Sequence, residues 1–265
     1  TTADNNTSVG YQSLYANTTG AQNTAVGRNA LDANTTASEN TAIGNSAMGN
    51  NTTGAENTAV GSASLFANTT GANNVAIGRD ALKANTTASN NTAVGYQAGT
   101  AVTTGTLNTL IGSLAGDAIT TGNSNVAVGY QTLSADTLGD RNVAIGLQAL
   151  MSQNFTSSTD SYNTAVGYAA GLSVTTGQVN TLVGGLSGDA LTTGGENTAI
   201  GYKTLSANTT GAYNTALGSR ALANFNNTTS AGTYNTAVGY NAGNDVTTGI
   251  ANTIIGSSAG DSLTD

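Results

Sequence analysis

The 265-residue sequence contains no cysteine, proline, histidine or tryptophan, and only 8% of its residues are charged. The absence of cysteine excludes disulfides and thiolate metal sites, and it leaves the redox compartment open. The absence of histidine and cysteine removes the usual nucleophile–base pairs, there is no phosphate-binding loop, and the carboxylates are dispersed along the chain. We therefore expect neither an enzyme nor a cofactor.

Charge is scarce and mostly negative, with fourteen acidic residues against six basic ones and a net charge of −8. The cations form no basic stripe, so nucleic acid is not an expected partner. They are Arg28, Arg79, Lys83, Arg141, Lys203 and Arg220. No apolar run reaches membrane-spanning length, and no lipidation motif occurs, so we expect no membrane insertion.

The chain is built from a short repeat, Asn-Thr-Ala-Val-Gly or a close variant, which occurs fifteen times. Twelve of the fourteen gaps between the repeat glycines are 17 residues long, and two are 21. Such a fixed period predicts stacked copies of one small unit, each burying its apolar side on its neighbours. We expect a single repeat domain over residues 1–265, with coils ending at Gly10 through Gly256.

Positions in each coil are counted here from the repeat glycine. Position −4 is always Asn, −3 is Thr or Val, −2 is usually Ala, −1 is Val, Ile or Leu, and +3 is small. This pattern predicts a very short strand with −3 and −1 on one face and −4 and −2 on the other. A corner follows at Asn-Thr-Thr-Gly. The predicted fold is all-β: a parallel β-solenoid, or β-roll, of about fifteen 17-residue coils, stacked about 4.8 Å apart and roughly 70 Å long.

Two coil types share this frame. Most coils have Leu or Met at +4, whereas six have Gly there and gain an aliphatic residue at +7. Close packing requires such an exchange, because an unfilled leucine site costs about 2–5 kcal/mol. Positions +4 and +7 are therefore expected to fill one continuous core. The exchanged pairs are Gly99 with Val102, Gly116 with Ile119, Gly171 with Val174, Gly188 with Leu191, Gly243 with Val246, and Gly260 with Leu263.

From Gly95 onward the coil types alternate in pairs, which gives a super-unit of 72 residues with one four-residue insertion. The insertions lie near residues 151–162 and 223–234. Because they interrupt the coil, these loops are the expected recognition surface. The candidate recognition residues are Phe155 and Phe225, with Tyr162 and Tyr234 at the loop ends.

Several polar motifs admit more than one interpretation. The position −4 asparagines could form a stacked amide ladder or cap their own turns, and both roles are structural. The corner motif fits the N-glycosylation pattern, for instance at Asn17 and Asn208, although turn chemistry also explains it. The Thr-Thr pairs would form threonine rows suited to ice binding, but adjacent threonines on a corner do not share one flat face.

Asp117, Asp189 and Asp261 occupy position +5 in the second Gly-type coil of each pair. They are four coils apart, roughly 19 Å, so one chain cannot bring them to a common ion. A threefold assembly could form a carboxylate ring around a cation at each level. The alternative is a solvated aspartate in a turn, and no metal site is otherwise expected.

Position −2 bears on oligomerisation. It becomes large in three coils, at Leu110, Leu182 and Ile254, which would be unusual on a solvated face and natural at a subunit contact. A homotrimer is therefore a hypothesis. The chain stops partway round a coil at residues 264–265, which favours a segment of a longer fibre over end-to-end stacking of separate subunits.

Residues 74–78 and 142–146, both Asn-Val-Ala-Ile-Gly, resemble head repeats of trimeric autotransporter adhesins. The commoner Asn-Thr-Ala-Val-Gly-Tyr form, as at 163–168, is similar to repeats in phage tail-fibre-like proteins and large bacterial surface proteins. The resemblance extends over essentially the whole chain. It implies a left-handed parallel β-roll, three chains packed together, and a role in attachment to a host surface, glycan or protein ligand.

The sequence thus predicts a non-enzymatic segment of an adhesive or structural fibre, located outside the cell, on its surface, or on a virion. An ice- or surface-binding solenoid is the competing hypothesis. A purely structural extracellular filament is the third.

Overall fold

The computed structural model describes residues 3–229 and 232–264, and within them the protein is an all-β parallel solenoid of about fifteen coils. Residues 1–2, 230–231 and 265, which include parts of both chain ends and of the second insertion, lie outside the described residues. The solenoid comprises two compact units, Thr1–Ala127 and Val128–Asp265. In the described part of the chain, no helix is long and apolar enough to span a membrane.

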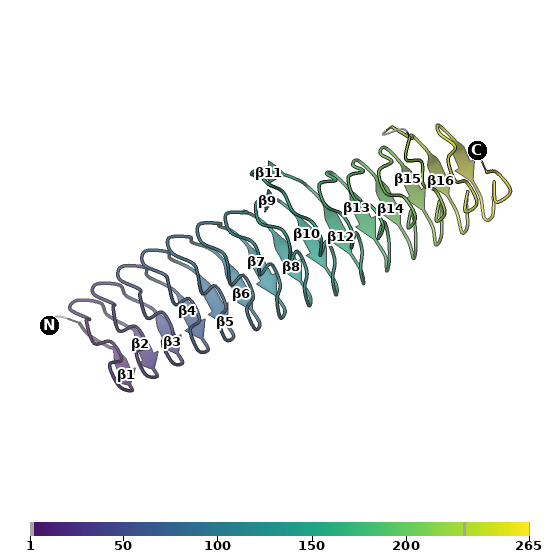
Figure 1. Ribbon diagram of the computed structural model, residues 1–265. Helices are drawn as coiled ribbons and strands as arrows, with labels where there is room; N and C mark the ends of the chain where they lie inside the picture. Colours follow the sequence, from purple (N-terminus) through teal and green to yellow (C-terminus); the bar gives the residue numbers. More distant parts are fainter. Residues whose placement is uncertain (1–2, 230–231, 265) are drawn as a thin grey trace. The chain divides into compact units, whose positions relative to one another are not determined.

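Unit 1 stacks one coil on the next in sequence order (Figure 1). Its strands pair in parallel with identical positions opposite each other, for example Thr24 with Thr41 and Val26 with Ile43. They are β1 (Thr7–Val9), β2 (Thr24–Val26), β3 (Thr41–Ile43), β4 (Thr58–Val60), β5 (Val75–Ile77), β6 (Thr92–Val94) and β7 (Thr109–Ile111). Strand β8 (Val126–Val128) contains the boundary between the two units.

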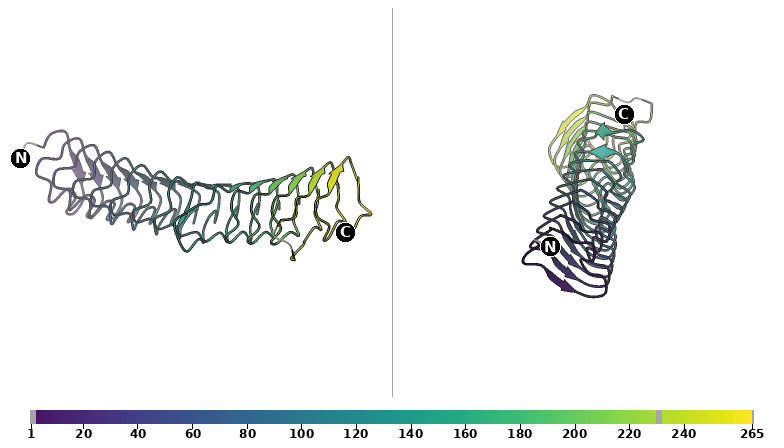
Figure 2. Two further views of the ribbon diagram at one scale, coloured as in Figure 1. Left: turned by 90° about the horizontal axis from the view of Figure 1, so that it is seen from above. Right: turned by 90° about the vertical axis from the view of Figure 1, so that its left-hand side faces the viewer.

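Unit 2 repeats the same arrangement, and its main strands lie along one side of the coils (Figure 2). These strands are β10 (Val143–Ile145), β12 (Thr164–Val166), β13 (Thr181–Val183), β14 (Thr198–Ile200), β15 (Thr215–Leu217), β16 (Thr236–Val238) and β17 (Thr253–Ile255). Two further short strands, β9 (Gly139–Asp140) and β11 (Thr159–Asp160), pair in parallel across the first insertion.

The repeat glycine is required by contact between coils. At Gly61, φ is +136°, and an added Cβ would lie 2.6 Å from the backbone carbonyl of Gly78 in the next coil. Real Cβ atoms do not approach backbone this closely, and this φ strains any other residue. Two further positions between the glycine and the corner, +2 and +4, also have positive φ, as at Ala63 and Leu65. The coil therefore closes tightly after its strand.

The core is the predicted column. Leu31, Met48, Leu65 and Leu82 at +4 are completely buried, and in the Gly-type coils Val102 and Val174 at +7 are completely buried as well. The exchange between +4 and +7 is thus confirmed. The two end coils differ, because Leu14 in the first coil is half-buried and Leu263 in the last is exposed. The large buried +4 and +7 side chains of the other coils are Leu133, Leu150, Leu205, Leu222, Ile119, Leu191 and Val246.

The strand faces divide as predicted, but the large residues at −2 were misinterpreted. Leu110 is fully buried and lies between two glycines, because a Cβ on Gly99 would meet its Cδ1 at 2.7 Å and a Cβ on Gly116 its Cδ2 at 2.8 Å. Leu182 and Ile254 fill the same space beside the other Gly-type pairs. Position −2 is therefore interior, and these residues give no argument for a subunit contact.

Candidate functional site

The outward face of the sheet is a regular surface of threonine and aliphatic side chains. Ile43 and Ile77 at −1 are 40% and 39% exposed, and the intervening Val60 is half-buried. The threonines at −3, such as Thr41 and Thr58, point to the same side. We call this surface, formed by positions −3 and −1, the outer sheet face.

Sequence reasoning did not place this face outside. The aliphatic residue at −1 is the most constant apolar feature of the repeat, yet its exposure in eight coils is at least 36%. Alternation of strand side chains allows either face to be inside. The coil encloses so little volume that alanine at −2 is buried and the larger residue is left at the surface. The eight are Val9, Ile43, Ile77, Ile111, Ile145, Ile200, Leu217 and Ile255.

The asparagines at −4 form a buried ladder behind this face, which confirms the ladder interpretation. Asn74 donates its backbone N–H to Oδ1 of Asn57 at 2.9 Å and its Nδ2 to the same oxygen at 3.1 Å. Its Nδ2 also donates to the carbonyl of Ala88, 2.9 Å away at the far corner of the coil. Each asparagine thus ties two coils and both sides of its own coil. The ladder is structural and presents no amide to a ligand.

A second ladder occupies the corner. Asn51 donates Nδ2 to Oδ1 of Asn34 at 3.2 Å, and Asn68 does the same to Asn51 at 2.8 Å. The candidate glycosylation site Asn208 is fully buried, with its Nδ2 donated to the carbonyl of Gly211 at 2.9 Å. Asn17 donates Nδ2 to the carbonyl of Gly20 at 2.9 Å. A glycan on the Asn208 nitrogen would not fit this folded coil.

The Thr-Thr pairs are partly used in stacking. In most of the pairs, the hydroxyl of the first threonine donates to a backbone carbonyl one coil further on, as Thr52 does to Thr69 at 2.9 Å and Thr69 to Thr86 at 3.1 Å. The second threonine, such as Thr53, is exposed. The corner therefore has one exposed threonine row rather than a flat double row. The outer sheet face also carries threonines, with an aliphatic residue on the same face of each strand.

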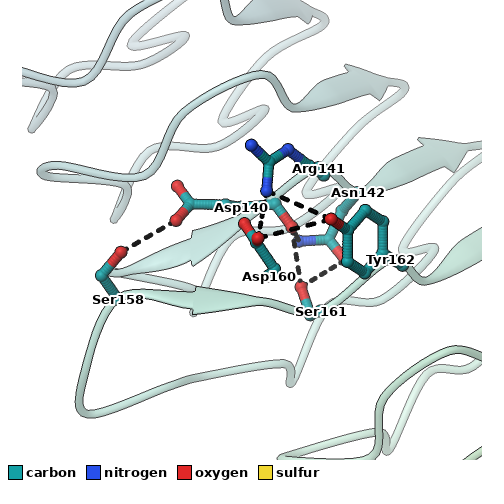
Figure 3. Close-up of polar contacts among 7 residues, drawn as sticks. All are labelled: Asp140, Arg141, Asn142, Ser158, Asp160, Ser161 and Tyr162. Atoms are coloured by element: carbon teal, nitrogen blue, oxygen red, sulfur yellow. Dashed lines mark hydrogen bonds and ion pairs between the residues drawn. The ribbon is translucent and has the colours of Figure 1, made fainter.

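The first insertion carries a polar cluster around β9 and β11 (Figure 3). Arg141 forms an ion pair with Asp160 and donates Nη1 to the hydroxyl of Tyr162 at 3.2 Å. Its guanidinium carbon also lies 5.6 Å from the centre of the Tyr162 ring. The negative charge of Asp160 is the largest cause that raises the pKa of Arg141, and the interaction with Tyr162 is the second. The cluster holds Tyr162 half-exposed at the loop end.

Hydrogen bonds from two serines of the insertion connect the same cluster to the coil. Ser158 donates Oγ to Oδ2 of Asp140 at 2.9 Å, and Ser161 donates Oγ to the Asp140 carbonyl at 3.0 Å. Ser161 also bonds Oδ1 of Asn142, a member of the −4 ladder, at 2.8 Å. The loop is therefore anchored to the stack through buried Ser161.

The candidate recognition residues divide into two groups. Phe155 is 4% exposed and Phe225 is fully buried, so these rings fill the interior where the coil widens. Tyr162 and Tyr234 are more than half exposed. Tyr234 stacks on Tyr213 with ring centroids 5.0 Å apart and an interplanar angle of 5°. The sequence placed Tyr213 at the same coil position, −5, one coil earlier, but this pairing was not anticipated.

The acidic candidates do not converge. Asp117 and Asp189 are half-buried, and desolvation raises the pKa of each, whereas Asp261 is exposed. Among the described residues there is no group of three carboxylates or other ligating side chains that could hold a metal ion. A lone carboxylate supplies too few of the six to eight oxygens that Ca²⁺ takes. A ring made by three chains remains a prediction.

No protein-family model, curated protein or solved structure matches the chain.

Proposed function

We propose that the protein is a non-enzymatic segment of an extracellular or virion-borne fibre, which acts as a rigid shaft or adhesive head and associates with its own copies. The observation that carries this proposal is the outer sheet face. It is a periodic surface without a charged residue at −3 or −1, on a chain whose net charge is −8. Exposed regular apolar surface of this kind is typical of interaction sites.

The stacking explains the mechanical part of the proposal. Consecutive coils are joined by backbone hydrogen bonds at the strand, after the glycine and at the corner, for example Thr24 to Asn40 at 2.8 Å, Leu31 to Ala47 at 3.1 Å and Thr35 to Thr52 at 3.1 Å. The two asparagine ladders add side-chain bonds along the same direction. A coil cannot bend away from its neighbour without breaking several of these bonds, so the stack resists bending.

The proposed self-association uses the outer sheet face and gives a homotrimer. Packing of three such faces would cover the −1 aliphatics, and the absence of charge from the face avoids the repulsion that a net negative chain would otherwise meet. The test is the mass in solution by light scattering, which should be three times the chain mass of 26.0 kDa. A monomer mass for the unaltered chain would contradict the trimer.

A paired variant locates the contact. Ile43→Lys with Ile77→Lys places two charges on the outer sheet face at positions already about 40% exposed, so the coil should still fold. We expect this variant to be monomeric. Thr53→Lys adds a charge at an exposed corner and should keep the trimer mass. If both changes leave the mass unaltered, the outer sheet face is not the contact.

The adhesive role is assigned to the exposed tyrosines of the insertions, Tyr162 and Tyr234. An array of glycans and extracellular proteins would identify a ligand for the intact chain. Replacing both tyrosines with alanine should abolish that binding, whereas Tyr96→Ala, which removes a similarly exposed ring outside the insertions, should retain it. Equal binding by both variants would show that the insertion tyrosines do not bind the ligand. A chain that binds nothing on the array would be purely structural.

Ice binding is the second candidate, and one observation favours it. In strands such as β2, β3 and β4, threonine at −3 and an aliphatic residue at −1 point outward together, in identical register from coil to coil. The Thr-Thr corners considered from the sequence have only one exposed threonine row, whereas this face exposes two residues of every strand. Thermal hysteresis with ice shaping, lost in Ile43→Lys with Ile77→Lys, would support it. Absence of hysteresis in a monomeric preparation would exclude it.

A further inference from the structure

Unit 2 contains a polar surface pocket that the proposed fibre function does not use. Its volume is about 260 Å³, and its walls come from three consecutive coils. It is lined by Lys203, Ser206, Arg220, Ala223, Asn224 and Asn244. Two of the six cations of the chain therefore share one pocket, and no lining residue is acidic.

The solenoid itself brings the two cations together. Lys203 and Arg220 both occupy position +2 of successive coils, where the backbone has positive φ, 52° and 60° respectively. The backbone N–H of Arg220 donates to the carbonyl of Tyr202 at 2.9 Å, which fixes the spacing of the two coils. Equal backbone conformation in neighbouring coils directs both side chains to the same side. Two positive charges at neighbouring +2 positions repel each other, and an anion bound between them would offset this repulsion.

Neither cation is neutralised by an ion pair. Within the described residues, the ion pairs involve Arg79, Lys83 and Arg141, but not Lys203 or Arg220. Lys203 lies 5.7 Å from the centre of the Tyr202 ring. Burial raises the pKa of Asp189, one coil earlier, and the charge of Lys203 opposes that shift without a direct contact. Asp245 follows the lining residue Asn244 in sequence and accepts a hydrogen bond from Nδ2 of Asn244 at 2.9 Å.

The chain also supplies a neutral copy of this place. A shift of 72 residues relates Lys203 to Gln131 and Arg220 to Gln148. There Nε2 of Gln148 donates to Oε1 of Gln131 at 3.3 Å, so the two amides satisfy each other across the coils. The fold therefore does not require cations at +2 of these two coils. The charged pair at Lys203 and Arg220 needs an explanation other than stability.

We propose that this pocket binds an oxyanion, namely a sulfate, phosphate or carboxylate group. Lys203 and Arg220 supply the charge, and Arg220 can hold two oxygens at once because its guanidinium donates in parallel. The side-chain amide of Asn224 supplies a further donor. The anion could be free in solution or attached to a sugar, and both sources present the same chemical group.

The test compares the intact chain with Lys203→Gln/Arg220→Gln, which installs the glutamine pair that the first super-unit already accommodates. Calorimetric titrations with inorganic sulfate, galactose 6-sulfate and galactose, at low salt, measure binding. We expect the sulfated ligands to bind, galactose not to bind, and the variant to bind at least tenfold more weakly. Arg28→Gln/Lys83→Gln removes the same charge from unit 1 and should bind like the unaltered chain.

The outcomes separate the source of the anion from the existence of the site. Tighter binding of galactose 6-sulfate than of inorganic sulfate indicates a sugar-borne ligand, and equal binding indicates a free anion. No sulfate binding by the intact chain, or equal loss in both double variants, would overturn the proposal. Neither result depends on self-association, so the fibre proposal would stand or fall separately.

Discussion

Truncation of Leu110 to alanine tests how the two coil types share one core. Leu110 is fully buried, and its two methyl groups occupy the space above Gly99 and Gly116, at 2.7 and 2.8 Å from where their Cβ atoms would be. Its loss leaves a cavity that spans two coils and that glycine cannot fill. Large-to-small changes of this kind cost about 2–5 kcal/mol, and we expect Leu110→Ala to fall in the upper half of that range.

A compensating change makes the test sharper. Gly99→Leu alone should destabilise by about 1–3 kcal/mol, because the new side chain overlaps Leu110 and takes a positive φ of 58°. Combined with Leu110→Ala, the same leucine loses its closest overlap, and the remaining near contacts of its Cβ are Leu82 Cδ2 at 3.0 Å and Val102 Cγ2 at 3.4 Å. The double variant should therefore be more stable than the sum of the single changes predicts, by at least about 1 kcal/mol.

The assay is urea unfolding followed by circular dichroism, with hydrogen exchange to localise the effect, because repeat proteins can lose coils from part of the stack. Leu107→Ala is the matched control, since this leucine is 58% exposed, and its truncation should cost less than about 0.5 kcal/mol. A Leu110→Ala variant as stable as Leu107→Ala, or strict additivity in the cycle, would refute the shared core.

Three further predictions concern the glycines, a buried acid and backbone strain. Gly61→Ala should lower the stability of the folded chain by more than about 3 kcal/mol in thermal or urea unfolding. Gly256→Ala should cost far less, because a Cβ at Gly256 meets no backbone of a following coil. Equal losses would contradict the argument that the coils approach too closely for a Cβ. Burial raises the pKa of Asp136 above its ordinary 3.8, so the folded state binds the proton more tightly and stability should fall as pH rises through the window above 3.8. Unfolding between about pH 3 and pH 7 should show a steeper slope in the native chain than in Asp136→Asn, which keeps the raised pKa values of Asp117 and Asp189, and the reasoning fails if the two slopes match. Val179 is a β-branched, half-exposed residue with a φ of 59°, a backbone conformation that strains its side chain. Val179→Gly should therefore raise the midpoint of unfolding, with a gain of about 1 kcal/mol in stability. A lower midpoint would show that the contacts of the valine side chain outweigh this strain.

The ladders show where sequence reasoning succeeded. Asparagine occupies position −4 in all fifteen coils, so stacking the coils in register places each asparagine beside that of the next coil. The hydrogen bonds between Asn74 and Asn57 confirm this arrangement. The corner ladder ends where the coil type changes. Oδ1 of Asn85 is buried with no hydrogen-bond partner, because the next coil has Val102 in place of an asparagine. The sequence shows that substitution, but only the structure shows the unpaired oxygen.

The insertions show where sequence reasoning was limited. Phe155 and Phe225 are the only large aromatic residues of their loops apart from the terminal tyrosines, which made them reasonable recognition residues. Their burial depends on how far each insertion widens the coil, and the loop sequence does not reveal that widening. The repeat places Lys203 and Arg220 at +2 of successive coils, but the pocket that they line with a third coil is found only in the structure.

The sequence by itself determined the period, the parallel stack and the exchange between +4 and +7. These follow from repetition and from close packing, which leave few arrangements for a 17-residue unit. Only the tertiary structure decided which strand face is inside. Alternation makes the two faces equivalent in sequence, and hydrophobicity alone would bury the larger −1 side chain. The narrow coil has room for alanine at −2 and not for a row of valine and isoleucine, so volume rather than hydrophobicity sets which residues reach the surface.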